Sequence, residues 1–324
     1  MKLQRGVGYQ KTIITRRCVM DIFQLKYFVS AANIGNFTLA AYENHISQSS
    51  FSKQIMNLED ELGVELFVRK KRHIVLTAAG EHCLDYAYKM LSVYDDMVRG
   101  MESYTASHML PITVAAIPVM LPYALESVIF KVNRTFPDLL FSIHELPEST
   151  YVLTALQRGE CDFAIMRTDF LDQELYEIYP VVSDRLAAVL SINHPLAAEK
   201  EISLKSLEND RMIMPPKETD LRIIGENACI RAGFRPNIAC ITSGNMELTL
   251  KIVKNQGMVY LAFEKVIGYY PRKGFAVVPL KEDIVSRTAF VRLKSRVDTR
   301  TQKKVAEFLG KEYGVVIEER AKAN

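Results

Sequence analysis

The sequence predicts a chain of mixed class, with a small α+β unit near the N-terminus, a long helix, and a larger α/β region behind it. Three observations lead to this prediction. Residues 20–62 repeat apolar side chains at helical spacing, residues 64–76 form two short apolar runs around a basic turn, and from Leu110 onward apolar strands alternate with helices. A chain of 324 residues is long enough for two or three such units.

The N-terminal unit, residues 20–80, is predicted to begin with three helices. The first should end at Gly35, because glycine readily adopts the left-handed conformation that closes a helix. A short second helix starts at Thr38. Ser47 can cap a third helix, which should end at Gly63. The short second helix, the turn and the third helix together predict a helix-turn-helix.

The third helix has one apolar face and one polar face. Phe51, Ile55, Leu58 and Leu62 recur at intervals of 4, 3 and 4 and are expected to be buried. Glutamine, serine and lysine can bond base edges or phosphates in a major groove. The alternative is an ordinary three-helix packing unit with a polar outer face. The candidate DNA-binding residues of this helix are Gln48, Ser49, Ser50, Ser52 and Lys53.

Residues 64–76 are predicted to form a two-stranded hairpin, or wing. The apolar runs 64–68 and 73–76 flank a turn of four basic residues that begins with Arg69 and ends with Arg72. A basic tip beside a helix-turn-helix can contact phosphates, so Arg69 and Arg72 are further candidate DNA-binding residues. A solvated charge run is the alternative interpretation.

Residues 1–19 are predicted to be a disordered basic extension. They contain five basic residues and no acidic one, and they lack an apolar period. A net charge of +3 for the whole chain is weak evidence for nucleic-acid binding, whereas basic residues concentrated in this segment and in the wing indicate contact with phosphates.

A long helix is predicted over residues 77–105. Thr77 can cap it, and no helix breaker lies between Glu81 and Met101. Apolar residues recur at heptad spacing, so the helix should pack against a partner. The seam consists of Leu84, Ala87, Leu91, Tyr94, Val98 and Met101.

Residues 110–312 are predicted to form an α/β domain with mostly parallel sheets. The expected strands are 112–117, 139–145, 161–166, 187–192, 211–214, 237–241, 258–262 and 287–293. The expected helices are 121–136, 150–158, 219–232, 245–255 and 300–312.

Composition and motifs argue against several other classes of protein. The chain contains no run of about 18 uncharged apolar residues, so no membrane span is predicted. The N-terminus lacks the apolar core of a secretory signal. We therefore expect a cytoplasmic protein without membrane contact. The five cysteines include no CxxC pair, which favours a reducing compartment over disulfides or a zinc site. GxSxG, P-loop and HExxH motifs are absent, so we expect no catalytic residue, metal or cofactor.

Residues 20–80 contain a set of short motifs at fixed spacing, through which the segment closely resembles the N-terminal domain of LysR-type transcriptional regulators. A weaker resemblance to the effector domain of that family extends to about residue 310, through His194-Pro-Leu-Ala, Ala232-Gly233-Phe with Pro236, and Val253 to Gly257. The N-terminal motifs are Leu25-Lys-Tyr-Phe, Gly35-Asn-Phe-Thr, Ala40-Ala41, Ser47-Gln48, Phe51-Ser52-Lys53-Gln54-Ile55, Leu58-Glu59, Leu62-Gly63, Leu66-Phe67 with Arg69, and Leu76-Thr77 with Gly80.

Three positions depart from the family pattern. Ser49-Ser50 stand where the family often has proline, and Asn44 stands where leucine is common. Ala116 replaces a serine or threonine that often lies beside the effector, and Pro118 offers no N–H. We therefore expect an effector with more apolar surface than a simple dicarboxylate.

The resemblance implies a DNA-binding regulator built as a dimer of dimers, with helix 77–105 pairing two chains. It also implies an effector domain like a periplasmic binding protein, with lobe I from 110–180 and 275–300 and lobe II from 181–274. A small molecule would lie between the lobes, although each proposed contact could equally be a structural loop residue. The candidate effector-binding residues are Ala116, Ile117, Pro118, Leu146, Pro147, Thr219, Thr242 and Ser243.

The partners implied by the resemblance are double-stranded DNA, a small-molecule effector, further copies of the chain and RNA polymerase. Two alternatives stay open. One is a regulator of the same architecture that needs no effector, and the other is an enzyme whose site lies in the α/β region.

Overall fold

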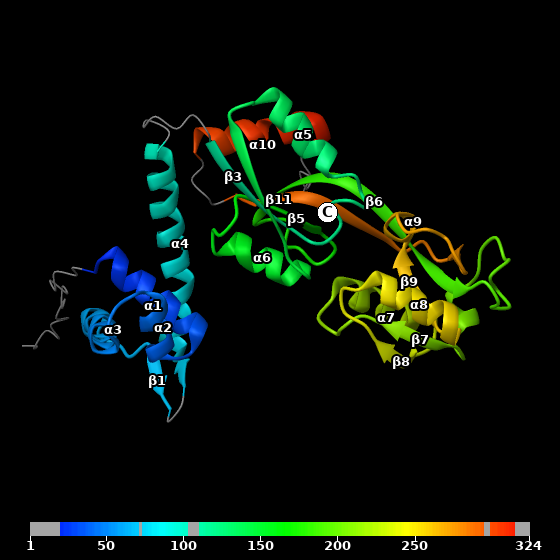
Figure 1. Ribbon diagram of the computed structural model, residues 1–324, viewed down its shortest axis with the longest axis horizontal. Coiled ribbons are helices and arrows are strands. Elements are labelled where there is room, and N and C mark those ends of the chain that lie inside the picture. The colour runs from blue at the N-terminus through cyan, green and yellow to red at the C-terminus, as the bar shows by residue number, and fades with distance from the viewer. Residues whose placement is uncertain (1–19, 71–72, 103–109, 295–298, 315–324) are drawn as a thin grey trace, which may run out of the picture. The chain divides into compact units, whose positions relative to one another are not determined.

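A computed structural model describes residues 20–70, 73–102, 110–294 and 299–314 (Figure 1). The chain divides into two compact units, Met1–Leu91 and Ser92–Asn324. Each unit is described by itself. The basic extension 1–19 and Arg72 of the wing lie outside the described residues.

The first unit contains the three predicted helices and the hairpin. Gly35 and Gly63 close two of the helices in the left-handed conformation, with φ of 68° and 71°, and Ser47 caps the third helix. These helix ends confirm the predictions made from sequence. The elements are α1 (Ile22–Ile34), α2 (Phe37–Glu43), α3 (Gln48–Leu62), β1 (Phe67–Arg69), β2 (Ile74–Leu76) and α4 (Ala78–Glu102).

An aromatic cluster holds this unit together. The ring of Phe37 lies 6.1 Å from that of Phe51 and 5.4 Å from that of Phe67, and Phe28 also contacts Phe67 at 5.4 Å. Because Phe67 belongs to the hairpin and Phe51 to α3, these contacts fix the hairpin against the helices. Aromatic pairs at such distances add to the stability from buried apolar area.

The apolar side chains of α4 divide into two sets with different roles. Ala87 is fully buried, and Leu84 and Leu91 pack against the core of the first unit, so these seam residues serve the fold of their own chain. A second row remains 45–58% exposed and is the surface that a partner helix could cover. This exposed row consists of Tyr86, Met90, Val93, Met97 and Met101.

The second unit is built on a sheet of nine strands in the order β4-β3-β5-β11-β6-β9-β7-β8, with β10 also paired to β6. The first three strands in this order are mutually parallel, and β9, β7 and β8 are mutually parallel. The strands are β3 (Leu110–Ala116), β4 (Leu139–Glu145), β5 (Phe163–Arg167), β6 (Tyr176–Ser191), β7 (Arg211–Met214), β8 (Asn237–Ile241), β9 (Val259–Phe263), β10 (Phe275–Pro279) and β11 (Val285–Leu293).

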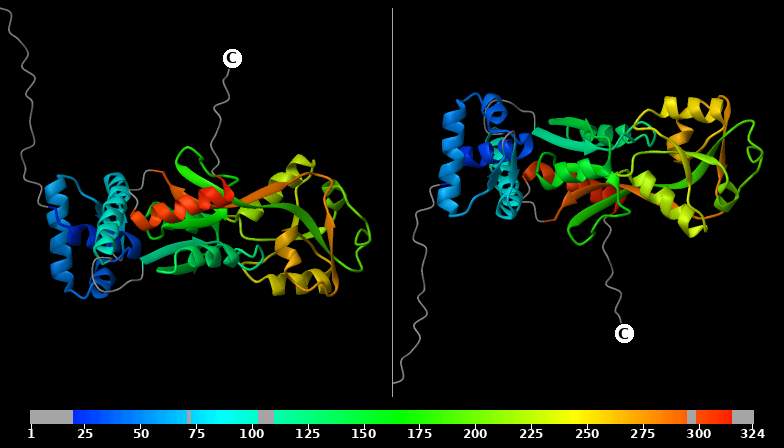
Figure 2. Two further views of the ribbon diagram at one scale, coloured as in Figure 1. Left: turned by 90° about the horizontal axis from the view of Figure 1, so that it is seen from above. Right: turned by 90° about the horizontal axis from the view of Figure 1, so that it is seen from below.

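Helices cover both faces of the sheet in each lobe (Figure 2). Residues of β9 alternate between two cores, with Val259 and Leu261 in one and Tyr260 and Ala262 in the other, which explains why this strand is apolar throughout. Lobe I has α5 (Glu126–Thr135), α6 (Ser149–Gln157) and α10 (Arg300–Tyr313), and lobe II has η1 (Leu204–Leu207), α7 (Asp220–Arg231), α8 (Met246–Gln256) and α9 (Glu264–Gly268).

The two lobes share one strand. The first half of β6 pairs with β11 in lobe I, and its second half pairs with β9 and β10 in lobe II. The sequence predicted only the second half, 187–192, because the first half is less apolar and gains its burial from strand partners distant in the chain.

Two further predictions were wrong in detail. Residues 118–125 form turns, so the helix predicted from 121 begins only at Glu126. Strand β10 was not predicted, and it pairs with Ala187–Ser191 while Phe275 and Val278 pack in the cores of lobe II. Residues 275–280 therefore belong to lobe II, and the return to lobe I occurs at β11.

Candidate nucleic-acid interface and ligand cleft

A single asparagine side chain fixes the turn between α2 and α3. Asn44 closes α2, and its Nδ2 donates to Ser30 Oγ at 2.7 Å and to the Ala40 carbonyl at 2.8 Å. His45 follows with a left-handed φ of 55°. The side chain that departs from the family pattern thus ties α2 to α1, which holds the helix-turn-helix in one geometry.

Serine hydroxyls stabilise the start of α3. Ser47 Oγ accepts from the Ser50 backbone N–H at 3.2 Å and donates to Ser50 Oγ at 2.8 Å, while Ser49 Oγ lies 3.1 Å away. These bonds satisfy a backbone donor that the helix itself cannot satisfy. The pair Ser49-Ser50 therefore supports the helix start without the proline that is common in the family.

The polar face of α3 is accessible in its N-terminal half. Gln48, Ser49, Ser50 and Lys53 are exposed, whereas Ser52 is half-buried and accepts from Gln48 Nε2 at 3.1 Å. Ser50 is engaged with the helix cap. The side chains best placed to meet a base edge or phosphate are therefore Gln48, Ser49 and Lys53.

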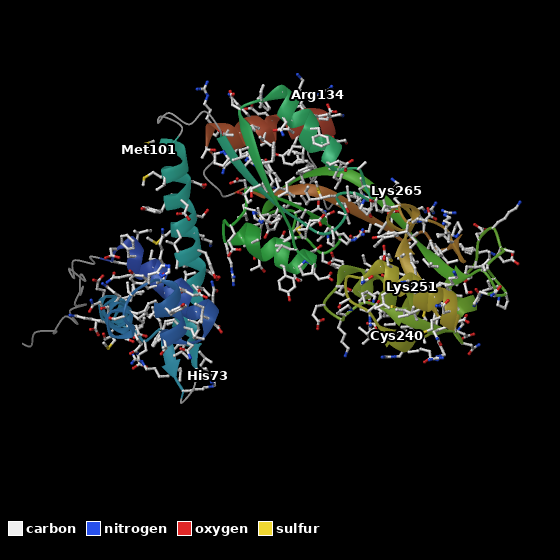
Figure 3. All side chains as sticks on the ribbon, in the orientation of Figure 1. His73, Met101, Arg134, Cys240, Lys251 and Lys265 are labelled. Atoms are coloured by element: carbon white, nitrogen blue, oxygen red, sulfur yellow. The ribbon has the colours of Figure 1, made fainter. Side chains whose placement is uncertain are left out.

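The hairpin is held to α3 by Glu59, whose Oε1 accepts from the backbone N–H groups of Leu66 at 2.7 Å and Phe67 at 3.1 Å. Arg69 is exposed, and its guanidinium carbon lies 5.4 Å from the centre of the Phe37 ring. His73 directly precedes β2, the second strand of the hairpin (Figure 3). The hydrogen bonds of Glu59 thus hold the hairpin that carries Arg69 against α3.

The junction of the two lobes, at the carboxyl ends of their parallel strands, is the candidate ligand cleft of the second unit. Ser149, the first residue of α6 in lobe I, donates a short hydrogen bond to the carboxylate of Asp220, the first residue of α7 in lobe II. Arg167, the last residue of β5, stacks on the Phe263 ring at the end of β9, 3.7 Å from its centre. Side chains from both lobes therefore converge at this point.

The eight residues predicted from sequence lie at these strand and helix ends, but several have structural roles. Ala116 and Ile117 are buried, and Pro118, Pro147 and Ser243 are exposed. Leu146 is half-buried and packs against the core of lobe I.

Two of the predicted hydroxyls already have partners. Thr219 Oγ1 caps α7 by accepting from the Arg222 N–H at 3.1 Å, and it donates to the Pro216 carbonyl at 2.9 Å. Thr242 Oγ1 lies 2.8 Å from Thr249 Oγ1. The proton and one lone pair of the Thr219 hydroxyl are therefore already used within the fold.

Arg167 is the central charged side chain that sequence reasoning missed. It is 7% exposed, donates to Ser286 Oγ at 3.1 Å and to the Tyr123 hydroxyl at 3.3 Å, and covers the Phe263 ring. Ser286 in turn donates to Asp169 at 2.5 Å. A charged residue directly after the apolar run Phe-Ala-Ile-Met was the signal for it, because that position is the carboxyl end of a buried strand.

Carboxyl groups surround this arginine. Burial raises the pKa of Glu148 to about 7, with a further contribution from Asp220, while Arg167 lowers it. Burial also raises the pKa of Asp220, against the lowering effects of the Ser149 hydrogen bond and Arg167. Neither acid stands out in the sequence, because one precedes and the other begins a helix, where acidic residues are common.

The polar contact between the lobes continues to Asp184 on the shared strand β6. Its carboxylate accepts from the Tyr123 hydroxyl at 3.0 Å and from the Lys265 backbone N–H at 3.1 Å. Burial raises the pKa of Tyr123 to about 12, Arg167 lowers it and Asp184 raises it. These bonds join the loop after β3 to the start of α9 and fix the base of the cleft.

Within the described residues, no group of three or more His, Cys, Asp or Glu side chains is arranged to hold a metal ion. The same residues include no helix long and apolar enough to cross a membrane.

The fold and the two surfaces define a DNA-binding transcription regulator with an effector-binding domain. A family profile described as the LysR substrate binding domain matches residues 108–314, and one described as a bacterial regulatory helix-turn-helix protein of the lysR family matches residues 22–81. The chain belongs to the LysR family of transcription regulators.

Similar proteins cover most of the chain. The hydrogen peroxide-inducible genes activator of Haemophilus influenzae is 28% identical over 83% of this chain and 89% of its own length. The Hca operon transcriptional activator HcaR of Escherichia coli is 31% identical over 72% and 78%. The structure of a full-length OxyR variant from Pseudomonas aeruginosa has the same fold, with a TM-score of 0.63 and 23% identity over 91% of this chain and 94% of that one.

Proposed function

We propose that this regulator recognises specific double-stranded DNA through the N-terminal half of α3 and the tip of the β1–β2 hairpin, and that a small molecule bound between the two lobes controls it. The observation that best supports DNA recognition is the exposed row Gln48, Ser49 and Lys53 on a helix whose start and turn are fixed by hydrogen bonds. Gln48 is suited to adenine and Lys53 to guanine or phosphate.

Arg69 and Arg72 contribute contacts with phosphates in this proposal. Phosphate contacts set affinity for all sequences, whereas base contacts set preference among sequences. The two groups of residues therefore differ in a measurable way, which makes their roles separable by mutation.

DNA binding is tested on fragments recovered from a genome-wide map of sites bound by the full-length protein. Gln48→Ala should cost about 1–3 kcal/mol and relax preference at one position, and Arg69→Ala should weaken all sequences and lower the salt slope by about one. Asn57→Ala, an exposed polar side chain further along α3, is the matched control. Unchanged affinity and preference in both variants would contradict the assignment.

The assembly in this proposal is a dimer of dimers, paired through the exposed row of α4. Such an apolar row on a surface helix is typical of a helix pairing site. The regulator would act in the cytoplasm, where its DNA lies, and would alter transcription through contact with RNA polymerase. Sedimentation of the full-length chain tests the assembly, and a monomer at micromolar concentration would contradict it.

Thiol oxidation is not part of the proposed signal, although some relatives are named as hydrogen peroxide-inducible activators. A reactive cysteine needs an accessible thiolate. Cys161 and Cys229 are buried, burial raises the pKa of Cys229 to about 11, and burial also raises the pKa of Cys83. None of the four described cysteines, including half-buried Cys240, forms a disulfide. These features support a signal delivered by a bound molecule.

A further inference from the structure

The cleft has an excess of negative charge. The charges of Asp220 and Glu218 act on Glu148, and that of Asp169 acts on Asp220. Arg167 is the positive group that acts on both Glu148 and Asp220. A ligand that brings only negative charge would add to this imbalance. A ligand with positive charge would relieve it.

The positions that usually attract anions carry acidic residues in this chain. Helices α6 and α7 begin at the cleft, and free N–H groups at a helix start attract anions. Here Glu148 is the residue at the cap of α6 and Asp220 is the first residue of α7, so a carboxyl group stands at each helix start and would repel an anion there, although neither carboxyl group caps its helix. The guanidinium of Arg167 is engaged with two hydroxyls and an aromatic ring.

Glu148 has a carboxyl group without a partner. Its side chain makes no capping hydrogen bond to α6, and it forms no hydrogen bond or ion pair with any residue that the structure describes. It is nevertheless half-buried. A carboxylate in such surroundings is costly unless a donor or a cation meets it.

Buried hydroxyls near the same groups also lack partners. Tyr260 is 5% exposed, and its hydroxyl has no hydrogen bond to the described part of the chain. Burial raises the pKa of Tyr260, Glu148 raises it further and Arg167 lowers it. Thr288 is 1% exposed, and its Oγ1 has no partner among the described residues. Thr288 is paired directly with Arg167 across β11 and β5, so both side chains project from the same face of the sheet.

We propose that the effector binds through a protonated amine placed between Glu148 of lobe I and Asp220 of lobe II, with the Tyr260 hydroxyl as a neutral partner. This inference rests on the proposed function of the cleft as the effector site. Arg167 lies at the base of the cleft, and its guanidinium covers the apolar ring of Phe263.

An amine in this position would favour the closed arrangement of the lobes. Ser149 and Asp220 already connect the two helix starts. A cation shared by one acid from each lobe interacts more strongly when the lobes are close, and such differential affinity is what allows a ligand to shift a conformational equilibrium. An anion has no such advantage here.

The test compares probes that share a four-carbon frame and differ in charge. Putrescine, γ-aminobutyrate, butanediol and succinate are titrated into the full-length protein by calorimetry, together with phenethylamine and phenylacetate as an aromatic pair. The proteins compared are the natural sequence, Glu148→Gln, Asp220→Asn and the control Glu199→Gln, in which the same chemical change is made at an exposed acid outside the cleft.

We expect at least one amine-bearing probe to bind, and succinate, butanediol and phenylacetate to fail. Affinity for that amine should fall at least about tenfold in Glu148→Gln and in Asp220→Asn, because a hydrogen bond to a charged group is lost, and it should not change in Glu199→Gln. Binding of succinate or phenylacetate in place of amines overturns the inference, as does failure of every amine or an equal loss in the control.

A parallel DNA-binding measurement separates this inference from the proposed function. An amine that binds in the cleft while DNA affinity and footprint stay unchanged supports the inference and contradicts ligand control of transcription. A footprint that responds only to the anionic probes supports ligand control and overturns the inference.

Discussion

The stability of the effector domain should depend on pH through Glu148, and Glu148→Gln should remove that dependence. The pKa of this carboxyl is about 7 in the folded protein, against an ordinary value of 4.5. The folded state therefore binds the proton more tightly than the unfolded state does. Stability is greatest below the ordinary pKa and is lost as pH rises from about 4.5 to about 7.

The size of the effect follows from that shift. A difference of this size corresponds to about 3 kcal/mol for a fully buried group, and solvent screening at a half-exposed side chain reduces it to about 1 kcal/mol. Glutamine keeps the shape and removes the charge. The variant should therefore match the natural protein at acidic pH and exceed its stability by about 1 kcal/mol above neutrality.

Urea unfolding followed by far-UV circular dichroism at a series of pH values measures this difference. Dichroism is the appropriate signal because the chain contains no tryptophan. Glu199→Gln serves as the control for the loss of one charge at the surface. A difference between Glu148→Gln and the natural protein that stays constant across the pH range would refute the reasoning.

Three further predictions concern the N-terminal unit and the assembly. Asn44→Ala removes two hydrogen bonds and should cost about 1–2 kcal/mol in thermal unfolding of this unit; unchanged melting would contradict the proposed role of the turn. Gly80→Ala would place a Cβ 2.2 Å from the Leu66 carbonyl oxygen, so we expect a loss of about 1–3 kcal/mol in urea unfolding, and a neutral effect would show that α4 packs less closely on β1. Val93→Asp and Met97→Asp should produce smaller species in sedimentation because each would bury an unpaired charge, whereas Met97→Leu should not; an unchanged assembly would exclude this row from the interface.

Features that depend on neighbours in sequence were predicted correctly. The ends of α1 and α3 follow from Gly35, Ser47 and Gly63, whose conformations and hydrogen bonds are local. The buried face of α3 follows from spacing for Phe51, Ile55 and Leu58, whereas Leu62, which was also expected to be buried, is 38% exposed at the end of the helix. The strands β4, β7 and β8 were located to the residue because each is a short apolar run between breakers.

Features that depend on distant partners were not predicted. Arg167 gains its role from Phe263 and Ser286, which lie far along the chain. One local feature was also missed: Thr219 was expected to contact a ligand, and the sequence did not show that its hydroxyl caps α7. Glu148 and Asp220, the two acids of the cleft, belong to different lobes, so they come together only when the two lobes pack against each other.

The seam of α4 shows the same limit. Heptad spacing correctly indicated an apolar helix, but it did not separate the side chains that pack within the chain from those left exposed. Leu84 and Leu91 contact the core of the first unit, while Met97 and Val93 do not. The distinction depends on where the other helices of the unit lie.

The position of β11 has a consequence for how the protein is made. In lobe I this strand lies between β5 and β6, yet it follows all of lobe II in the chain. A ribosome completes β5 and β6 well before β11, so the gap between them stays open while lobe II is synthesised. During that interval both strands expose unpaired edges, which is the condition that favours aggregation and the need for chaperones. Chains terminated before Val285 would keep those edges permanently.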